Sequence, residues 1–177
     1  MNLANKLTMA RIFMIPAFLL VLYLVEDFGN IYALGIFILA SLTDFLDGYV
    51  ARKFNQITDF GKFMDPLADK MLVVAAMCWF VEIGQMPAWA LLIVLVREFA
   101  VSGLRMIASD KGRVIAAGWS GKVKTAVTMV CIMIMLYLPE IMWLNQVNIA
   151  LIVLTTLYSG IEYFSKNKDV LKEGGLS

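Results

Sequence analysis

Residues 44–69 read DFLDGYVARKFNQITDFGKFMDPLAD, and this stretch decides the fold. It contains two pairs of aspartates: Asp44 and Asp47 are three residues apart, and Asp65 and Asp69 are four apart. Residues at these spacings lie on one face of a helix. Strongly apolar sequence adjoins the stretch on both sides. The pattern therefore predicts two helices at the edge of a membrane, each carrying a pair of carboxylates toward the connecting loop.

The paired aspartates predict a metal site. Carboxylates at the border of a bilayer are costly unless they are paired, hydrated or bound to metal. The chain has no histidine and only two cysteines, so oxygen atoms are the main metal donors available, and these suit hard divalent cations. Four carboxylates can share two Mg²⁺ or Mn²⁺ ions about 4 Å apart, as in two-metal phosphoryl-transfer sites. The alternative is that the aspartates are ordinary solvated charges.

Composition indicates an integral membrane protein. The chain has 177 residues, of which 61% are hydrophobic, and its mean hydropathy is +0.80. A soluble domain is nearer to half apolar. We expect one membrane domain that covers residues 1–177. The net charge of +1 argues against a bulk polyanion such as nucleic acid as a partner.

The expected fold is an all-α membrane bundle. An unclosed sheet cannot satisfy its backbone hydrogen bonds in lipid, whereas a helix can. A spanning helix needs about 20 apolar residues. We expect six transmembrane helices, preceded by a short N-terminal interfacial segment over residues 2–11. The six apolar segments are residues 9–25, 31–50, 63–81, 88–108, 123–138 and 143–163.

The distribution of basic residues predicts the orientation. The connectors at residues 26–30, 82–87 and 139–148 contain no lysine or arginine. Most basic residues lie instead near the N-terminus, in the other two connectors and in the C-terminal tail. Cytoplasmic loops carry such an excess of positive charge. We therefore expect both termini, and the aspartate-bearing stretch, to face the cytoplasm.

The spacing also resembles a family signature. The chain reads Asp44-x2-Asp47-Gly48-x2-Ala51-Arg52-x8-Gly61-x3-Asp65-x3-Asp69, which resembles the signature of the CDP-alcohol phosphotransferases at every position. The resemblance implies the six-helix membrane fold of these enzymes. It implies transfer of a phosphatidyl or related group from a CDP-linked donor to an alcohol, with release of CMP. A homodimer is also implied.

The resemblance assigns roles within the signature. It implies that Asp44, Asp47, Asp65 and Asp69 hold the two metal ions and that Asp69 is also the general base. The remaining positions would lie along the CDP donor, where small residues leave room and an arginine supplies a planar fork of donors for phosphate. This donor-binding set is Thr8, Gly48, Ala51, Arg52, Thr58 and Gly61.

Four further motifs resemble the branch of the family that makes phosphatidylglycerophosphate in the bacterial plasma membrane. That branch implies CDP-diacylglycerol as donor, glycerol 3-phosphate as acceptor and surrounding membrane lipids as partners. The motifs are Asn5-Lys6-Leu7-Thr8-x2-Arg11, Arg97-Glu98-Phe99-x2-Ser102-Gly103-Leu104-Arg105, Gly121-Lys122-x-Lys124-Thr125 and Ser159-Gly160-Ile161-Glu162-Tyr163.

Basic residues outside the signature are candidates for holding the phosphate of the acceptor. Arg105 and Lys122 are the first choices, followed by Arg97, Lys124 and Arg113. The alternative for Arg97 is an ion pair with a carboxylate inside the bundle, such as Glu98 of a neighbouring helix. Lys122 and Lys124 could instead extend toward the membrane surface or attract anionic lipid. Arg113 could instead be an ordinary charge of a cytoplasmic loop.

Three rival functions remain open at this level. The nearest is another member of the family, which would make phosphatidylinositol phosphate, phosphatidylserine or cardiolipin. A small ion transporter would place acids near the membrane midplane and show repeated halves, whereas these acids cluster at one surface and no repeat is visible. A structural or assembly protein gives no reason for the metal-like spacing.

Overall fold

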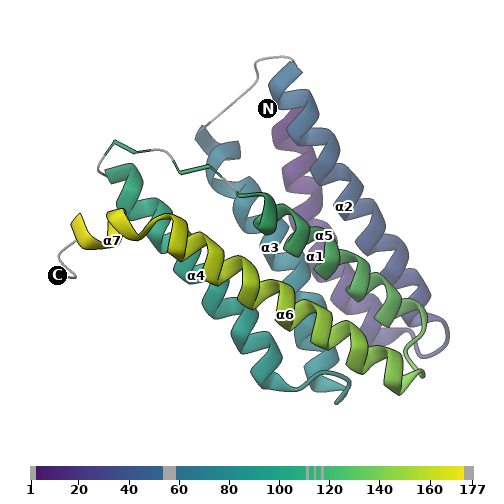
Figure 1. The fold of residues 1–177 in the computed structure, drawn as a ribbon. Helices are drawn as coiled ribbons and strands as arrows, with labels where there is room; N and C mark the ends of the chain where they lie inside the picture. The colour runs from purple at the N-terminus through teal and green to yellow at the C-terminus, as the bar shows by residue number, and fades with distance from the viewer. Residues whose placement is uncertain (1–2, 54–58, 111, 114, 117, 174–177) are drawn as a thin grey trace. The chain divides into compact units, whose positions relative to one another are not determined.

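The structure is a computed structural model, and it describes residues 3–53, 59–110, 112–113, 115–116 and 118–173. Within these residues the side chains at 3–7, 44–53, 59–69 and 171–173 lie outside the description. The described residues form seven helices and no strand (Figure 1). The helices are α1 (Leu3–Leu24), α2 (Gly29–Lys53), α3 (Asp59–Glu82), α4 (Ala88–Asp110), α5 (Trp119–Tyr137), α6 (Met142–Lys166) and α7 (Lys168–Glu173).

The all-α prediction is confirmed in the described residues, and each of the six apolar segments falls on one of the helices α1–α6. Two helices in this part of the chain, α5 and α6, are long and apolar enough to cross a membrane by length and composition alone. Helix α4 carries Arg97, Glu98 and Arg105 within its apolar length, which lowers its hydropathy.

Two features differ from the expectation. Residues 3–24 form one continuous helix, so the short N-terminal interfacial segment is not a separate element. No glycine or proline between Leu3 and Arg11 interrupts the helix, and the polar first turns simply extend the apolar part. The sequence also did not predict α7, whose six residues are too few to show a helical period.

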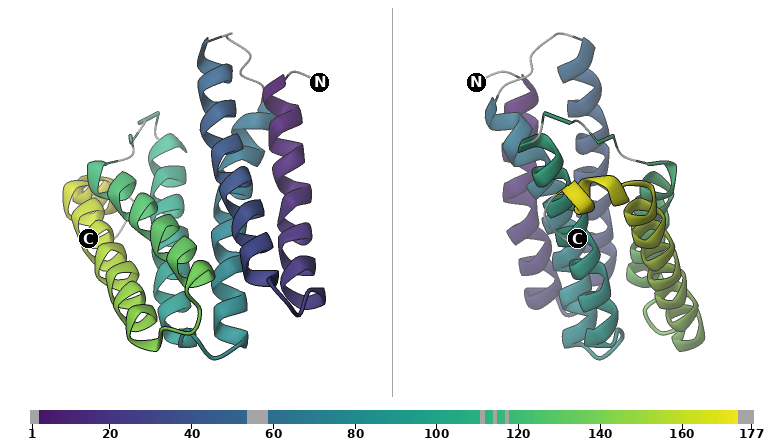
Figure 2. Two further views of the ribbon diagram at one scale, coloured as in Figure 1. Left: turned by 90° about the vertical axis from the view of Figure 1, so that its right-hand side faces the viewer. Right: turned by 60° about the vertical axis from the view of Figure 1, so that its left-hand side comes forward.

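The helices form two compact units, each considered separately below. The first unit comprises residues 1–83 and 132–141. In it α1 packs against both α2 and α3, and α1 and α2 run antiparallel (Figure 2). Phe18 and Phe37 meet in its core with ring centroids 6.1 Å apart. Ala33 and Ala40 on α2 and Ala76 on α3 are fully buried, as expected where small residues let membrane helices approach closely.

The second unit comprises residues 84–131 and 142–177. Here α4 packs against α6 and α7. Val101, Leu104, Tyr163 and Val170 belong to one buried cluster that joins these three helices. The side-chain amide of Asn167 donates to the carbonyl of Tyr163 at 2.7 Å, which satisfies a free carbonyl at the end of α6.

Candidate functional site

The two aspartate pairs lie on helices, as predicted. Asp44 and Asp47 are in the second half of α2, and Asp65 and Asp69 are in the first half of α3. Only residues 54–58 separate the two helices in the chain. Both helices belong to the first unit and contact one another. The two aspartates of each pair thus lie on one face of their helix. The end of α2 and the start of α3, which carry them, are adjacent in the chain.

The donor set fits hard divalent cations, because it consists of carboxylates and the chain has no histidine. The aspartate side chains lie outside the described ones, so their convergence stays a prediction. The described side chains contain no cluster of three or more carboxylates or cysteines that could hold a metal. Five donor-binding predictions also lie outside the described side chains: Gly48, Ala51, Arg52, Thr58 and Gly61.

Thr8 is the one predicted donor-binding residue whose side chain is described. It is 1% exposed, and so is Arg11, three residues later on α1. Figure 1 shows the start of α1 at the same end of the first unit as the end of α2 and the start of α3. Arg11 is a further site candidate, because its charged side chain is buried on the helix that begins at the aspartate-bearing end. Fully buried arginines are almost always paired, and Arg11 also has an interaction partner.

A buried network of charges joins three helices of the second unit. Arg97 of α4 donates through Nη1 to Oε1 of Glu98 at 2.9 Å, and Nζ of Lys124 of α5 donates to the same oxygen at 2.7 Å. Arg97 also donates through Nη2 to Oγ of Ser159 of α6 at 2.6 Å. The side chains of Arg97, Glu98 and Lys124 are only 13%, 16% and 6% exposed. Arg97 thus forms the ion pair that was the alternative to phosphate binding.

Two glycines adjoin the Arg97 side chain. A Cβ atom added at Gly121 of α5 would lie 3.4 Å from Nη2 of Arg97, and one added at Gly160 of α6 would lie 3.4 Å from its Cγ. Gly103, on α4 itself, would meet nothing within 4 Å. The glycines of two sequence motifs therefore both lie beside the arginine of a third motif.

Arg105 has a different environment. Its side chain is exposed, Nε donates to the hydroxyl oxygen of Tyr163 at 3.1 Å, and its guanidinium carbon lies 5.6 Å from the centroid of that ring. Lys122 and Arg113 are also exposed. The structure therefore separates the five acceptor candidates into two groups. Arg97 is partly buried and Lys124 is buried, and both contact Glu98, whereas the other three are exposed.

Sequence comparison identifies the family. The pattern of the family described as CDP-alcohol phosphatidyltransferase matches residues 1–158. The chain belongs to the CDP-alcohol phosphatidyltransferase family. Members of this family are membrane-embedded and generally use a divalent metal, so the chain is a membrane protein. Membership decides against the ion-transporter and assembly-protein alternatives.

Curated relatives cover nearly the whole chain. A CDP-diacylglycerol–glycerol-3-phosphate 3-phosphatidyltransferase of Bacillus subtilis (strain 168) is 43% identical, over 97% of both chains. Enzymes of the same name from Shigella flexneri serotype 5b and Escherichia coli (strain K12) are 38% identical over 93% of both chains. The similarity to this branch thus extends past the aspartate signature into the second unit.

The sequence did not predict the full roles of four residues of the second unit. Glu98 was considered only as a partner of Arg97, and Ser159, Gly160 and Tyr163 only as parts of motifs. Helical spacing was the available signal, because Ser159 and Tyr163 are four residues apart and share a face of α6. Spacing alone did not indicate which arginine each one contacts.

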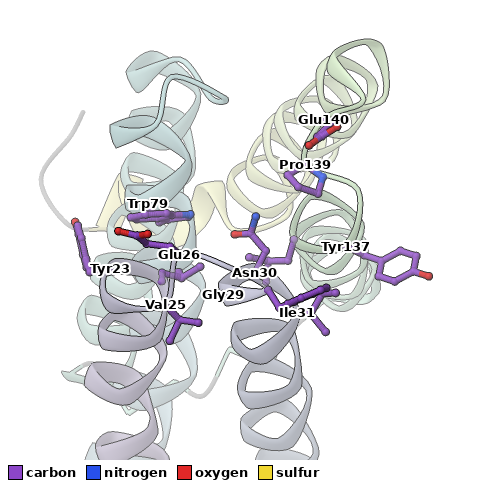
Figure 3. A pocket seen from close by; sticks show the side chains of 13 residues that line it. Tyr23, Val25, Glu26, Gly29, Asn30, Ile31, Trp79, Tyr137, Pro139 and Glu140 are labelled. Atoms are coloured by element: carbon purple, nitrogen blue, oxygen red, sulfur yellow. The ribbon is translucent and has the colours of Figure 1, made fainter.

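A separate cavity of about 460 Å³ lies in the first unit, around the end of α1 and the start of α2 (Figure 3). Tyr23 and Trp79 form one wall, with ring centroids 5.0 Å apart and an interplanar angle of 82°. Glu26 and Glu140 also line it, while Tyr137 is directed away from the other labelled side chains. Among the described residues, none of those lining the cavity is basic.

Proposed function

We propose that this chain transfers the phosphatidyl group of CDP-diacylglycerol to glycerol 3-phosphate, giving phosphatidylglycerophosphate and CMP. The observation that carries the proposal is the 43% identity over 97% of both chains to the Bacillus subtilis enzyme of that name. The match includes the aspartate signature and the second-unit motifs, so it covers the residues proposed for both donor and acceptor.

Two Mg²⁺ or Mn²⁺ ions would be held by Asp44, Asp47, Asp65 and Asp69. When bound, such ions neutralise phosphate charge and orient the reacting groups. Arg52 would add its planar fork of donors to the pyrophosphate of the donor. Thr8, Gly48, Ala51, Thr58 and Gly61 would complete the surface along the CDP group.

Asp69 would act as the general base. Its carboxylate would take the proton from the sn-1 hydroxyl of glycerol 3-phosphate as that oxygen forms a bond to the phosphorus bearing diacylglycerol. The bond from this phosphorus to the bridging oxygen then breaks, and CMP leaves with the bonding electron pair. Holding the hydroxyl and the phosphorus in line converts a bimolecular encounter into a step within one complex.

The acceptor phosphate would be held by Arg105 and Lys122, with Arg97, Lys124 and Arg113 as further candidates. The burial pattern supports this order. Arg97 and Lys124 already share the carboxylate of Glu98, whereas the side chains of Arg105 and Lys122 are exposed. An exposed cation can meet a soluble phosphate without leaving a buried carboxylate uncompensated.

We propose six membrane spans in the bacterial plasma membrane, with both termini and the active site on the cytoplasmic side. The absence of basic residues from three alternate connectors supports this orientation. A cytoplasmic site would give direct access to soluble glycerol 3-phosphate, while the lipid donor enters from the bilayer. We further propose a homodimer, on the family resemblance alone.

The test is CMP release by the purified protein from CDP-diacylglycerol, with glycerol 3-phosphate, inositol phosphate, serine and glycerol as separate acceptors. We expect rapid release with glycerol 3-phosphate and little with the other three, because glycerol lacks the anchoring charge. Faster release with serine or inositol phosphate would overturn the acceptor assignment but leave the phosphatidyl transfer intact. Absence of CMP release with every alcohol, in the presence of metal and lipid, would overturn both.

A further inference from the structure

The motif at the end of α6 has no part in the reaction as proposed above. Two of its side chains are buried, Ser159 at 1% and Tyr163 at 6% exposure. Each accepts a hydrogen bond from an arginine of α4: Ser159 from Arg97 and Tyr163 from Arg105. Successive turns of α6 therefore support two arginines that lie eight residues apart on α4.

The contact with Tyr163 uses one particular edge of the Arg105 guanidinium. A guanidinium has five N–H donors in a rigid plane, one on Nε and two on each Nη. Tyr163 accepts from Nε at 3.1 Å, and the four Nη donors of Arg105 make no hydrogen bond to any residue that the structure describes. The two Nη groups form an edge that binds a phosphate through two parallel hydrogen bonds.

Tyr163 is itself firmly held. Its ring belongs to the buried cluster of Val101, Leu104 and Val170, and it meets Phe164 edge-on, with centroids 6.4 Å apart and an interplanar angle of 79°. Arg105 lies over this ring at a distance where the cation is attracted to the aromatic face. A flexible arginine is thus anchored to a side chain with little freedom of its own.

We propose that Tyr163 is a positioning residue for the acceptor site: it holds Arg105 through Nε and the ring face, so that the Nη edge stays open to the phosphate of glycerol 3-phosphate. The proposal rests on the proposed function and names how one residue of that site is prepared. Preorganising a side chain before binding saves the ordering cost that binding would otherwise incur.

The decisive variant is Tyr163→Phe, which removes the hydroxyl oxygen and keeps the ring. We expect the KM for glycerol 3-phosphate to rise about 10-fold, the lower end of what the loss of one hydrogen bond with a charged donor costs. The KM for CDP-diacylglycerol and kcat should stay within about 2-fold of wild type. Tyr158→Phe is the matched control, because Tyr158 is exposed on the same helix and should leave all three parameters unchanged.

A double variant separates positioning from a general structural effect. If Tyr163 acts through Arg105, then adding Tyr163→Phe to Arg105→Ala should not raise the acceptor KM further. A second rise of the same size would overturn the proposal. So would an unchanged acceptor KM in Tyr163→Phe, or an equal rise in both KM values.

A binding measurement that needs no turnover can test the role of Tyr163 separately from the proposed function. Calorimetric titration with glycerol 3-phosphate should show weaker binding to Tyr163→Phe than to wild type and Tyr158→Phe. Absence of CMP release by wild type would refute the proposed function, and the same titration would still test the anchoring of Arg105. Equal affinity of all three proteins would overturn the positioning role even if wild type is active.

Discussion

Glu98→Gln should destabilise the protein, because one carboxylate oxygen of Glu98 serves two cations. Oε1 accepts from Arg97 at 2.9 Å and from Lys124 at 2.7 Å, and none of the three side chains is more than 16% exposed. Glutamine has nearly the same shape and retains one side-chain oxygen. The substitution therefore removes the negative charge without creating a cavity.

The expected loss follows from the lost charge on the acceptor. Both donors, Arg97 and Lys124, stay charged, so each contact to the glutamine oxygen keeps a hydrogen bond but loses the attraction between opposite charges. Removing one partner of a buried ion pair costs about 3–5 kcal/mol, and the retained hydrogen bonds offset part of this, so Glu98→Gln should lower the free energy of unfolding by about 2–3 kcal/mol. Glu98→Ala should cost about 3–5 kcal/mol, since it leaves buried cations without their shared carboxylate.

The assay is reversible unfolding in mixed detergent micelles, followed by circular dichroism. Glu140→Gln is the control, because Glu140 is exposed, and it should change the free energy by less than about 0.5 kcal/mol. Combining Glu98→Gln with Lys124→Met removes the ammonium together with its partner charge. The double variant should then be more stable than the sum of the two single losses by at least about 1 kcal/mol.

Two results would refute the reasoning. One is a Glu98→Gln protein as stable as the Glu140→Gln control. The other is strict additivity in the double variant, which would mean that Glu98 and Lys124 do not interact energetically. The first result would show that the charge of Glu98 does not stabilise the protein, and the second that its contact with Lys124 does not.

Further predictions concern the proposed reaction and the topology. Excess EDTA should abolish CMP release, and Mg²⁺ or Mn²⁺ should restore it; full turnover in EDTA would exclude the two-metal site. Asp69→Asn should keep part of the affinity for CDP-diacylglycerol while turnover falls about 10²- to 10⁴-fold, and near-normal turnover would reject Asp69 as the base. Arg105→Lys should raise the KM for glycerol 3-phosphate more than that for CDP-diacylglycerol, because an ammonium cannot reproduce a two-pronged contact; equal KM values in both proteins would exclude that contact. A cysteine placed at Asp59, in a chain without its own cysteines, should resist membrane-impermeant labelling from outside sealed vesicles, and labelling there would reverse the orientation.

The sequence alone predicted the helices and the place of the reaction. Apolar segments separated by polar connectors are a local property, so each predicted segment coincides with one helix of the structure. The aspartate spacing is also local, which is why the pairs could be assigned to the end of one helix and the start of the next. The same residues carried the family resemblance that the comparisons confirm.

The roles of the basic residues required the tertiary structure. Arg97 meets Ser159 across 62 positions of the chain, and Arg105 meets Tyr163 across 58. Such contacts depend on how α4 and α6 pack, and no periodicity within either helix encodes their pairing. The sequence therefore determined which residues carry charge at the membrane. The packing of the helices decided which basic side chains form ion pairs with Glu98 and which are exposed.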